Sequence, residues 1–332
     1  MLSYIARRLI MMVPTLLITS FIIFAIIQAP PGNYLDTYIT ELQSRGEAVD
    51  QGRIAFLREQ YGLDKPFLEQ YVDWVGNLLV GDLGFSFEYQ LPVNAVVGDR
   101  LWLTFVVSLA TILFTWIVAF PIGVYSAVRQ YSAGDYVFTT LGFIGLATPN
   151  FLLALILMYF MNVWFDVQIG GLMDDVYLEE DFSAGKLFSV LAHLVVPVVV
   201  IGTSGTAGMI RRLRANLLDE LHKQYVVTGR AKGLSPGRLL LKYPLRISLI
   251  PFVADIGNYL PSLVSSAAVV SIVMNLPTTG PMLIQALQVQ DMYLAGSFLM
   301  FLSMLTIVGM MVSDLALAAL DPRIRLEGGS QK

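Results

Sequence analysis

The 332-residue sequence contains no cysteine and only two histidines. Disulfides, thiolate catalysis and cysteine-based metal sites are therefore excluded, and so is a histidine-rich metal centre. Charged residues are also scarce, at 14% of the chain where soluble domains carry about a quarter. Apolar residues make up 56% of the chain, and its mean hydropathy is +0.67. These values indicate a membrane protein.

The sequence also lacks the short motifs of several enzyme classes. It has no Gly-x-x-x-x-Gly-Lys-Ser/Thr loop for cradling phosphate and no His-Glu-x-x-His motif. The segment "GTSGTAG" fails the Gly-x-Ser-x-Gly pattern of a nucleophile elbow, because residue 206 is threonine. We interpret its small residues, Gly202 with Thr206 and Ser204 with Gly208, as places where helices in lipid approach closely. Nothing in the chain therefore indicates an enzyme or a nucleotide site of its own.

Six stretches are long and apolar enough to cross a bilayer, whose core of about 30 Å needs roughly 20 helical residues. The third contains no charge, and the fifth is long enough for a span and a buried loop around "NLPTTGP". The predicted fold is all-α, a polytopic membrane protein with six transmembrane helices. The predicted spans are Leu9–Asp36, Leu101–Val128, Tyr136–Phe165, Leu187–Ile210, Ile247–Gln290 and Met292–Leu320.

Lysine and arginine are distributed unevenly between the two sides of these spans. Fifteen of the 21 lie on the side that holds both termini, nine of them between Arg211 and Arg246. The other side carries six among many carboxylates, such as the acidic cluster at 174–181. Because positively charged loops stay in the cytoplasm, both termini are predicted to be cytoplasmic. The first apolar run is too long for the core of a secretory signal, so we interpret it as a retained span.

The spans divide the chain into a first transmembrane helix at 1–29, an extracytoplasmic segment at 30–100 and a five-helix core at 101–332. The core includes a cytoplasmic loop at 211–247 and a re-entrant external loop near 275–290. In the extracytoplasmic segment, "GRIAFLREQYGL" and "FLEQYVDWVGNLL" are typical of short amphipathic helices. We expect the acidic side of this segment to meet a soluble receptor. The apolar stripe of its second helix should pack on the helix bundle: Phe67, Tyr71, Trp74, Val75 and Leu78.

The basic loop between the fourth and fifth spans has the local chemistry of a folded element. Leu217, Leu221, Tyr225 and Thr228 recur at helical spacing, and Gly233 supplies the left-handed position that commonly ends a helix. Ser235 and Pro236 then predict the N-cap and first turn of a second short helix. Such a basic elbow could bind anionic lipid, nucleic acid or protein. Because membrane spans tether both of its ends, we expect a cytoplasmic protein partner and no nucleic acid.

Five segments together resemble one protein family. "YVVTGRAKGLSPGRLLLKYPLRISLIP" is similar to the cytoplasmic loop of membrane permease subunits of bacterial and archaeal ABC importers, in the dipeptide, oligopeptide and nickel branch. "YIARRLIMMVPTLL", "QYGLDKPFLEQYVDWVGNLLVGDLGFSF" and "ATPNFLLALIL" resemble the family's opening, external segment and third span, and "ALDPRIR" its ending. The likeness extends over almost the whole chain. It implies the architecture of a type I ABC importer permease.

In such permeases the cytoplasmic loop forms a coupling helix that docks on the ATP-binding subunit. Val227, Thr228 and Gly229 take the places of the family's Glu-Ala-Ala-like triplet, with Gly229 in place of a usual alanine. Pro244 is unexpected in its helix, and "NLPTTGP" differs from the common Trp-Pro-Gly-x-Gly pattern. The resemblance implies these coupling residues: Tyr225, Val227, Thr228, Gly229, Arg230, Ala231, Lys232, Gly233 and Leu234.

The partners implied are a second homologous permease subunit forming a heterodimer, two ATP-binding subunits, an extracellular or periplasmic substrate-binding protein, and membrane lipid. ATP and Mg would be held by the partner subunits, and this chain would bind no cofactor. The implied cellular location is the cytoplasmic (inner) membrane of a bacterium or archaeon. Peptide is the expected cargo, with oligosaccharide or nickel as alternatives. Rival classes are an ion-gradient-driven transporter or channel and, less favoured, a membrane-bound enzyme.

Charges within the spans are few, and each calls for a reason because burial of charge in lipid is costly. Asp255 lies close to Arg246, and Asp314 precedes Asp321 by seven residues, about 10 Å along a helix. Both can therefore reach the cytoplasmic interface or pair with cations there. We expect Pro251, Asp255, Pro277, Gly280 and Asp314 to serve gating or structure, and His193 to be a hydrogen-bonded structural residue.

Overall fold

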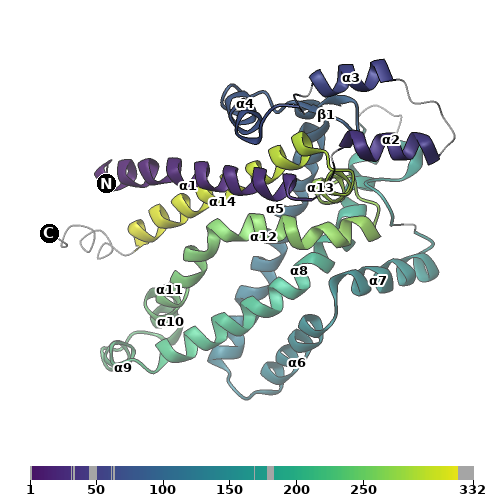
Figure 1. Cartoon of the computed structure of the whole chain (residues 1–332). Coiled ribbons are helices and arrows are strands. Elements are labelled where there is room, and N and C mark those ends of the chain that lie inside the picture. Colours follow the sequence, from purple (N-terminus) through teal and green to yellow (C-terminus); the bar gives the residue numbers. More distant parts are fainter. Residues whose placement is uncertain are drawn as a thin grey trace. The chain divides into compact units, whose positions relative to one another are not determined.

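A computed structural model describes residues 2–30, 32, 34–44, 51–60, 62, 64–167, 169–177 and 183–320. Part of the acidic cluster at 174–181, namely residues 178–181, therefore lies outside the described residues, and so does the "ALDPRIR" ending from residue 321 onward. The described chain is almost entirely helical (Figure 1). It divides into two compact units, Met1–Trp102 with Pro281–Val308, and Leu103–Gly280 with Gly309–Lys332.

The first unit contains the N-terminal helix and most of the segment predicted to be extracytoplasmic. The first helix ends at Gln28, so the predicted span to Asp36 is too long, and Asp36 lies in a second helix. A short antiparallel hairpin, which the sequence did not predict, pairs Phe85 with Pro92. The elements are α1 Leu2–Gln28, α2 Tyr34–Ser44, α3 Gln51–Gln60, α4 Phe67–Leu79, β1 Phe85–Ser86, β2 Leu91–Pro92, and parts of α5 Val93–Val128, α13 Thr279–Gln288 and α14 Met292–Leu320.

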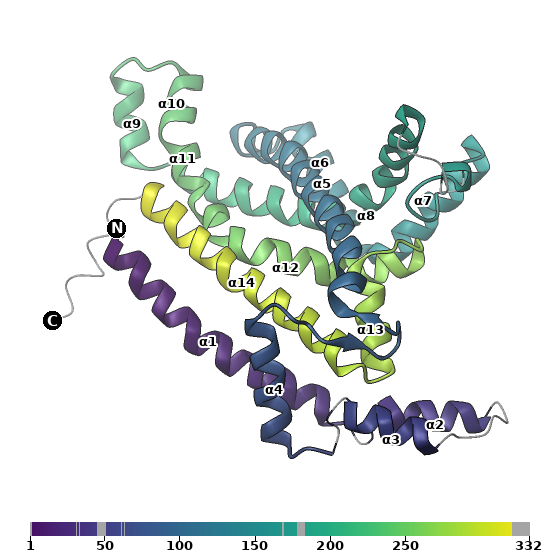
Figure 2. The ribbon, with the colours of Figure 1, turned by 90° about the horizontal axis from the view of Figure 1, so that it is seen from above.

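Helix α4 lies against α1 in Figure 2, and packing of aromatic side chains joins the two helices. Trp74 is fully buried in a cluster with Ile23, Phe24 and Met292. The ring centroids of Phe24 and Trp74 lie 5.6 Å apart, and Tyr71 shares a hydrogen bond of 2.9 Å with the Ser20 hydroxyl. The predicted packing of the aromatic stripe on the bundle is therefore confirmed.

A buried carboxylate anchors the hairpin to the start of α14. Asp291 is fully buried and accepts hydrogen bonds from Ser86 Oγ at 2.6 Å and from the Glu88 N–H at 3.1 Å. Its second oxygen accepts from the Leu294 N–H at 3.1 Å, which satisfies a free donor in the first turn of α14. Burial raises the pKa of the Asp291 carboxyl, while these hydrogen bonds act in the opposite direction.

The second unit contains most of the predicted transmembrane core and the loop predicted to be cytoplasmic. Helix α8 extends eleven residues past the predicted end of its span, so the predicted loop at 211–247 begins inside this helix. The elements are the rest of α5, then α6 Ala133–Ala147, α7 Asn150–Phe165, the 3-10 turn Asp175–Tyr177, α8 Ala184–Leu221, α9 Gln224–Ala231, α10 Pro236–Lys242, α11 Pro244–Ser248, α12 Ile250–Val273, and the ends of α13 and α14.

Four described helices are long and apolar enough to cross a membrane, and the number reaches six if each of two bent pairs is one span. The predicted third span is one such pair, because α6 and α7 meet at 104°. Pro149 disfavours helical backbone at Thr148, which is extended with ψ at 121°. The predicted fifth span contains the other bent pair, in which α12 bends by 55° between Tyr259 and Pro261. A proline at 261 removes the donor that the Gly257 carbonyl would otherwise pair with in the helix.

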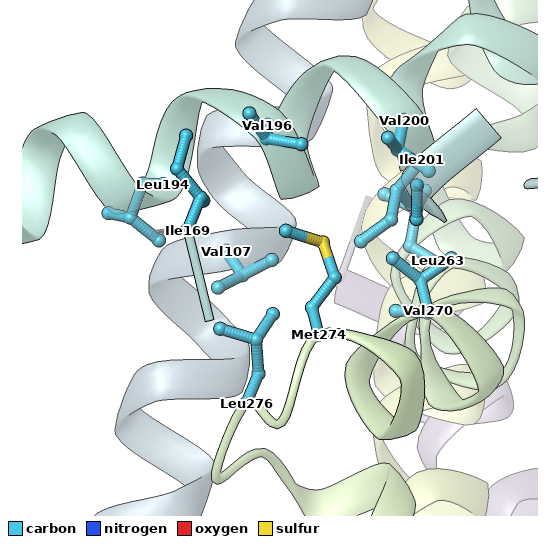
Figure 3. Packing of buried hydrophobic residues seen from close by; sticks show 12 residues of the cluster. Val107, Ile169, Leu194, Val196, Val200, Ile201, Leu263, Val270, Met274 and Leu276 are labelled. Carbon is cyan, nitrogen blue, oxygen red and sulfur yellow. The ribbon is translucent and has the colours of Figure 1, made fainter. Parts of the chain in front are cut away.

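The apolar core of the second unit gathers around α8 (Figure 3). Val200 from α8 and Val270 from α12 are fully buried there, and Met274 reaches into the same cluster just after α12 ends. Val107 contributes from α5, and Ala154 from α7. This cluster holds four predicted spans together.

The small residues of α8 provide close packing only in part. A side chain at Gly202 would place its Cβ 2.7 Å from the Phe114 ring of α5, so that glycine is required for the approach of the two helices. Gly208, by contrast, has no atom within 4 Å of the position of a Cβ. The prediction of close approach is therefore confirmed at Gly202 and wrong at Gly208.

A buried ion pair fixes α6 to α8. Arg214 donates from Nε and Nη2 to the two carboxylate oxygens of Asp135 at 2.9 and 2.8 Å, and the Asp135 side chain is only 2% exposed. The Tyr131 N–H donates to the same carboxylate at 2.9 Å, so the α5–α6 turn is held as well. The two-pronged geometry uses the planar guanidinium in a way that lysine could not.

Helices α12 and α14 touch through their backbones. A Cβ on Gly257 would lie 2.4 Å from the Gly309 carbonyl carbon, and a Cβ on Gly309 would lie 2.7 Å from the Gly257 oxygen. One turn nearer the start of α12, Ser313 Oγ lies 2.7 and 2.6 Å from the carbonyl oxygens of Val253 and Ala254. Two glycines and one serine therefore bind the two helices closely.

The Gly257–Gly309 contact makes a stability prediction. Gly309→Ala should destabilise the protein, because its Cβ would collide with backbone that cannot rotate away. Gly208→Ala is the matched control, since it adds the same atom to a helix in open space and should gain up to about 1 kcal/mol of helix propensity. Thermal unfolding in detergent measures both. A Tm for Gly309→Ala equal to or above that of Gly208→Ala would contradict the contact.

The buried ion pair makes a second prediction. Arg214→Gln should cost about 3 kcal/mol or more, because it leaves the buried Asp135 carboxylate without its cation. Arg212→Gln on the same helix should cost less than about 1 kcal/mol, because the side chains of Arg212 and its partner Asp255 are 47% and 44% exposed. Adding Asp135→Asn to Arg214→Gln should restore part of the loss. Equal shifts in Tm for the two arginine variants would refute this difference.

Candidate functional site

The predicted cytoplasmic loop forms a compact elbow of two short helices, α9 and α10, which lie side by side in Figure 2. Gly233 has a φ of +78°, as the sequence predicts, and its N–H donates to the Arg230 carbonyl at 3.0 Å. Ser235 is the N-cap by position but makes no side-chain capping bond, and Pro236 begins α10. The predicted first helix is interrupted, since α8 ends at Leu221 and α9 begins at Gln224.

The two helices of the elbow are packed through a small buried contact. Val226 and Leu239 are buried, and a Cβ on Gly229 would come within 2.5 Å of Leu239 Cδ1. Glycine at 229 therefore leaves room for the leucine of α10 where the family usually has alanine. The Leu234 N–H closes the turn by donating to the Gly229 carbonyl at 3.3 Å.

The outer surface of the elbow combines apolar and basic side chains. Val227 on α9 and Leu241 on α10 are exposed, at 54% and 67%. Leu234 is half-buried in the turn. The other exposed positions on this surface carry the predicted coupling residues Thr228, Arg230, Ala231, Lys232 and Gly233. Exposed apolar side chains interspersed with cations suit a protein partner with apolar pockets and acidic edges.

Short links tie the elbow to the helices that follow and precede it. The Tyr225 hydroxyl donates to a carboxylate oxygen of Glu220 in the last turn of α8. Burial and this carboxylate raise the pKa of the Tyr225 phenol, so it remains a donor at neutral pH. Pro244 begins α11 and does not break a helix, and Ser248 Oγ donates to its carbonyl at 2.7 Å. Pro251 likewise lies in the first turn of α12, where a proline does not break the helix.

The intramembrane acids lie where the sequence predicts, near the start of α12 and the end of α14. Arg212 Nη1 donates to Asp255 Oδ2 at 2.6 Å, and the Arg212 guanidinium lies 5.3 Å from the Phe252 ring centroid. The expected pairing of Asp255 with a cation is therefore observed. Asp314 is half-buried on α14, next to Ser313.

The predicted external loop is built around a pair of threonines. After α12 ends, Asn275 turns the chain with a φ of +51° and Pro277 is exposed. The Thr279 N–H donates to Thr104 Oγ1 of α5 at 3.0 Å, and the two hydroxyls lie 3.0 Å apart. Gly280 is buried against α12, where a Cβ would lie 2.6 Å from Ala268 Cα. The loop is thus fixed to α5 and α12.

His193 has the structural role that the sequence predicts. Its Nδ1 lies 2.9 Å from the Ser189 carbonyl oxygen, and its buried Nε2 lies 3.7 Å from Asp174 Oδ1. Ser189 Oγ donates to Asp174 Oδ2 at 2.7 Å, so the hydroxyl serves the carboxylate and is not activated by the histidine. Among the described residues no group of three or more His, Cys, Asp or Glu side chains could hold a metal ion.

Sequence reasoning missed the Asp135–Arg214 pair, the Thr104–Thr279 contact and Ser313. The first had a weak signal, since both residues flank predicted spans, but 79 positions separate them and no local pattern links them. The elbow itself was predictable because its turn depends on neighbouring residues.

Comparison with known proteins supports the membrane-permease interpretation. The family described as binding-protein-dependent transport system inner membrane component matches residues 119–326, and its N-terminal component matches residues 1–110. The chain is 34% identical over 328 residues to the oligopeptide transport system permease protein AppB of Bacillus subtilis, covering 98% of this chain and 99% of the relative. It is 29% identical over 342 residues to the dipeptide permease DppB of Escherichia coli, with the same coverage.

A third relative is the glutathione transport system permease protein GsiC of Pectobacterium atrosepticum, 30% identical over 328 residues, with 98% of this chain and 99% of that protein covered. The two family matches together span nearly the whole sequence. The chain therefore belongs to the binding-protein-dependent transport system inner membrane components, and the predicted identity of an ABC importer permease is confirmed.

Proposed function

We propose that this chain is one of two pore-forming subunits of an ABC importer that carries di- or oligopeptides inward. Its relatives are named as oligopeptide, dipeptide and glutathione permeases, and each is matched along nearly its whole length. The structural observation that supports the proposal is the folded elbow at α9–α10, where the exposed Val227 of α9, with the exposed Arg230 about one turn along the same helix, offers a docking site for a cytoplasmic partner.

In this proposal two ATP-binding subunits hold ATP and Mg, and one of them contacts the elbow at Tyr225 and at 227–234. A second, homologous but different permease chain completes the pathway, and an extracytoplasmic binding protein delivers the peptide. When the ATP-binding subunits close, they move the elbow, and α10 and α11 pass the movement to α12. The pathway switches between inward-open and outward-open forms only if ATP and cargo bind the two forms with different affinity.

At the opposite end of α12, the loop with Pro277 and Gly280 is the proposed external gate. Gly280 packs directly against the backbone of α12 at Ala268, so a shift of α12 would move the loop. Pro251, Asp255 and Asp314 lie on the two helices that transmit the movement, and we assign them positioning roles.

The proposed function predicts the composition of the complex and its energy source. Expressed with the proposed partners, the chain should retain ATP-binding subunits through detergent purification. Proteoliposomes of this complex with the binding protein should take up labelled peptide only when ATP is supplied on the elbow side. Purification without ATPase, or uptake driven by an ion gradient, would contradict the importer. ATP-driven uptake of oligosaccharide or nickel in place of peptide would contradict the cargo alone.

Gly233 provides a sharper test of coupling. Gly233→Val should greatly reduce peptide uptake and binding-protein-stimulated ATPase activity, because a β-branched residue is strained at a φ of +78°. Gly237→Val is the matched control, since both glycines are exposed with nothing within 4 Å of a Cβ, and only Gly233 has positive φ. Both variants should insert in the membrane. Unchanged uptake by Gly233→Val would count against the elbow as the coupling element.

A further inference from the structure

Helix α4 has a second apolar stripe that no described helix covers. Its first stripe packs on α1 through Tyr71 and Trp74. The second, which we name the outer stripe, consists of Leu68, Val72 and Leu79 and continues into Val80. These side chains are 63%, 64%, 83% and 81% exposed, respectively.

Asp73 and Asn77 of α4 lie away from the outer stripe, whereas Glu69 borders it at about 60° from Val72. With 3.6 residues per turn, Leu68, Val72 and Leu79 fall within about 40° of one another, and Asn77 falls about 140 to 180° away. Asp73 lies on the same polar side and pairs with Lys65 at 2.5 Å. This neighbouring carboxylate raises the pKa of the exposed Lys65 amine. A helix divided into charged and apolar sides in this way is typical of a membrane interface.

Contacts with α1 place α4 at a defined depth. Helix α1 contains a candidate span that ends at Gln28, and Gln28 Nε2 donates to Gln70 Oε1 at 2.7 Å. The Tyr71 hydroxyl meets Ser20, eight residues or about 12 Å further into the span. The helix therefore lies alongside the outer end of the span, at the depth where interfacial helices are buried.

The apolar surface of α1 continues onto α4. Phe21 of α1 is exposed, and its ring lies 6.0 Å from that of Phe67 and 5.3 Å from that of Tyr71. Leu17 and Ile22 beside it are also exposed, and only 11% of the most apolar window of α1 is buried. Helix α4 lies against α1 in Figure 2, and the exposed side chains of α1 and the outer stripe thus form one apolar surface in the first unit.

We propose that α4 is embedded in the outer leaflet, with the outer stripe in the acyl chains and Asp73 and Asn77 at the aqueous side. The occupant is lipid because the stripe lies within the depth of the span and continues the surface of α1. In this arrangement α4 anchors the middle of the extracytoplasmic segment to the membrane surface.

The absence of cysteine allows a direct test by single-site labelling. Val72→Cys in the outer stripe and Asn77→Cys on the polar side would each carry the environment-sensitive fluorophore NBD. The complete importer, with cysteine-free partner subunits, would be reconstituted in phosphatidylcholine liposomes. ATPase activity would verify the assembly of each labelled complex, and Leu68→Cys would replace Val72→Cys if that variant failed to assemble.

The label at 72 should show blue-shifted emission, quenching by nitroxide on the lipid acyl chains and protection from aqueous iodide. The label at 77 should show the opposite pattern, with acyl-chain quenching lower by about twofold or more. Iodide quenching at 72 equal to that at 77 would show that the stripe faces water. Protection of 72 from both quenchers would show that protein covers it, and either result would overturn the proposal while leaving the importer function intact.

Discussion

The contact of Leu239 with Gly229 is the constraint on which the proposed action of the chain depends. A push on α9 reaches the membrane only if α9 and α10 move as one body. Leu239 fills the space that a side chain at 229 would occupy, and Val226 is buried beside it. Interiors packed in this way are stiff because few voids remain for side chains to move into. The unusual glycine therefore makes the elbow tighter than alanine would allow.

Beyond the elbow, polar contacts carry the connection into the spans. Arg212 meets Asp255 between α8 and α12, Arg214 meets Asp135 between α8 and α6, and Ser313 bonds α14 to α12. The buried Asp135 and Ser313 side chains find few replacement partners when their bonds break, whereas the half-exposed Arg212–Asp255 pair can exchange its partner for water. The two buried connections are therefore expected to persist as the helices move, and to concentrate motion elsewhere.

The prediction from sequence was accurate where local chemistry determines structure and incomplete where distant residues meet. Gly233 and Pro236 define the elbow by their own backbone preferences, so the turn was predictable. Hydropathy identified the third span but gave no sign of its 104° bend, although Pro149 was a local cue. The Asp135–Arg214 pair depends on how α6 packs on α8. The outer stripe of α4 was not predicted because its residues border the aromatic stripe on the helix surface, so the sequence pattern shows one broad apolar side.

Motion is most easily accommodated at the bend in α12. Before the bend, the helix is held by α14 at Gly257 and by α8 at Asp255. After it, the chain runs through Val270 in the core to the loop fixed by Thr279. Pro261 weakens the helix between these two anchored halves by removing one hydrogen bond. Helix α12 thus connects α11, which follows the elbow, with the external loop, and its bend at Pro261 is where its two halves would change their angle.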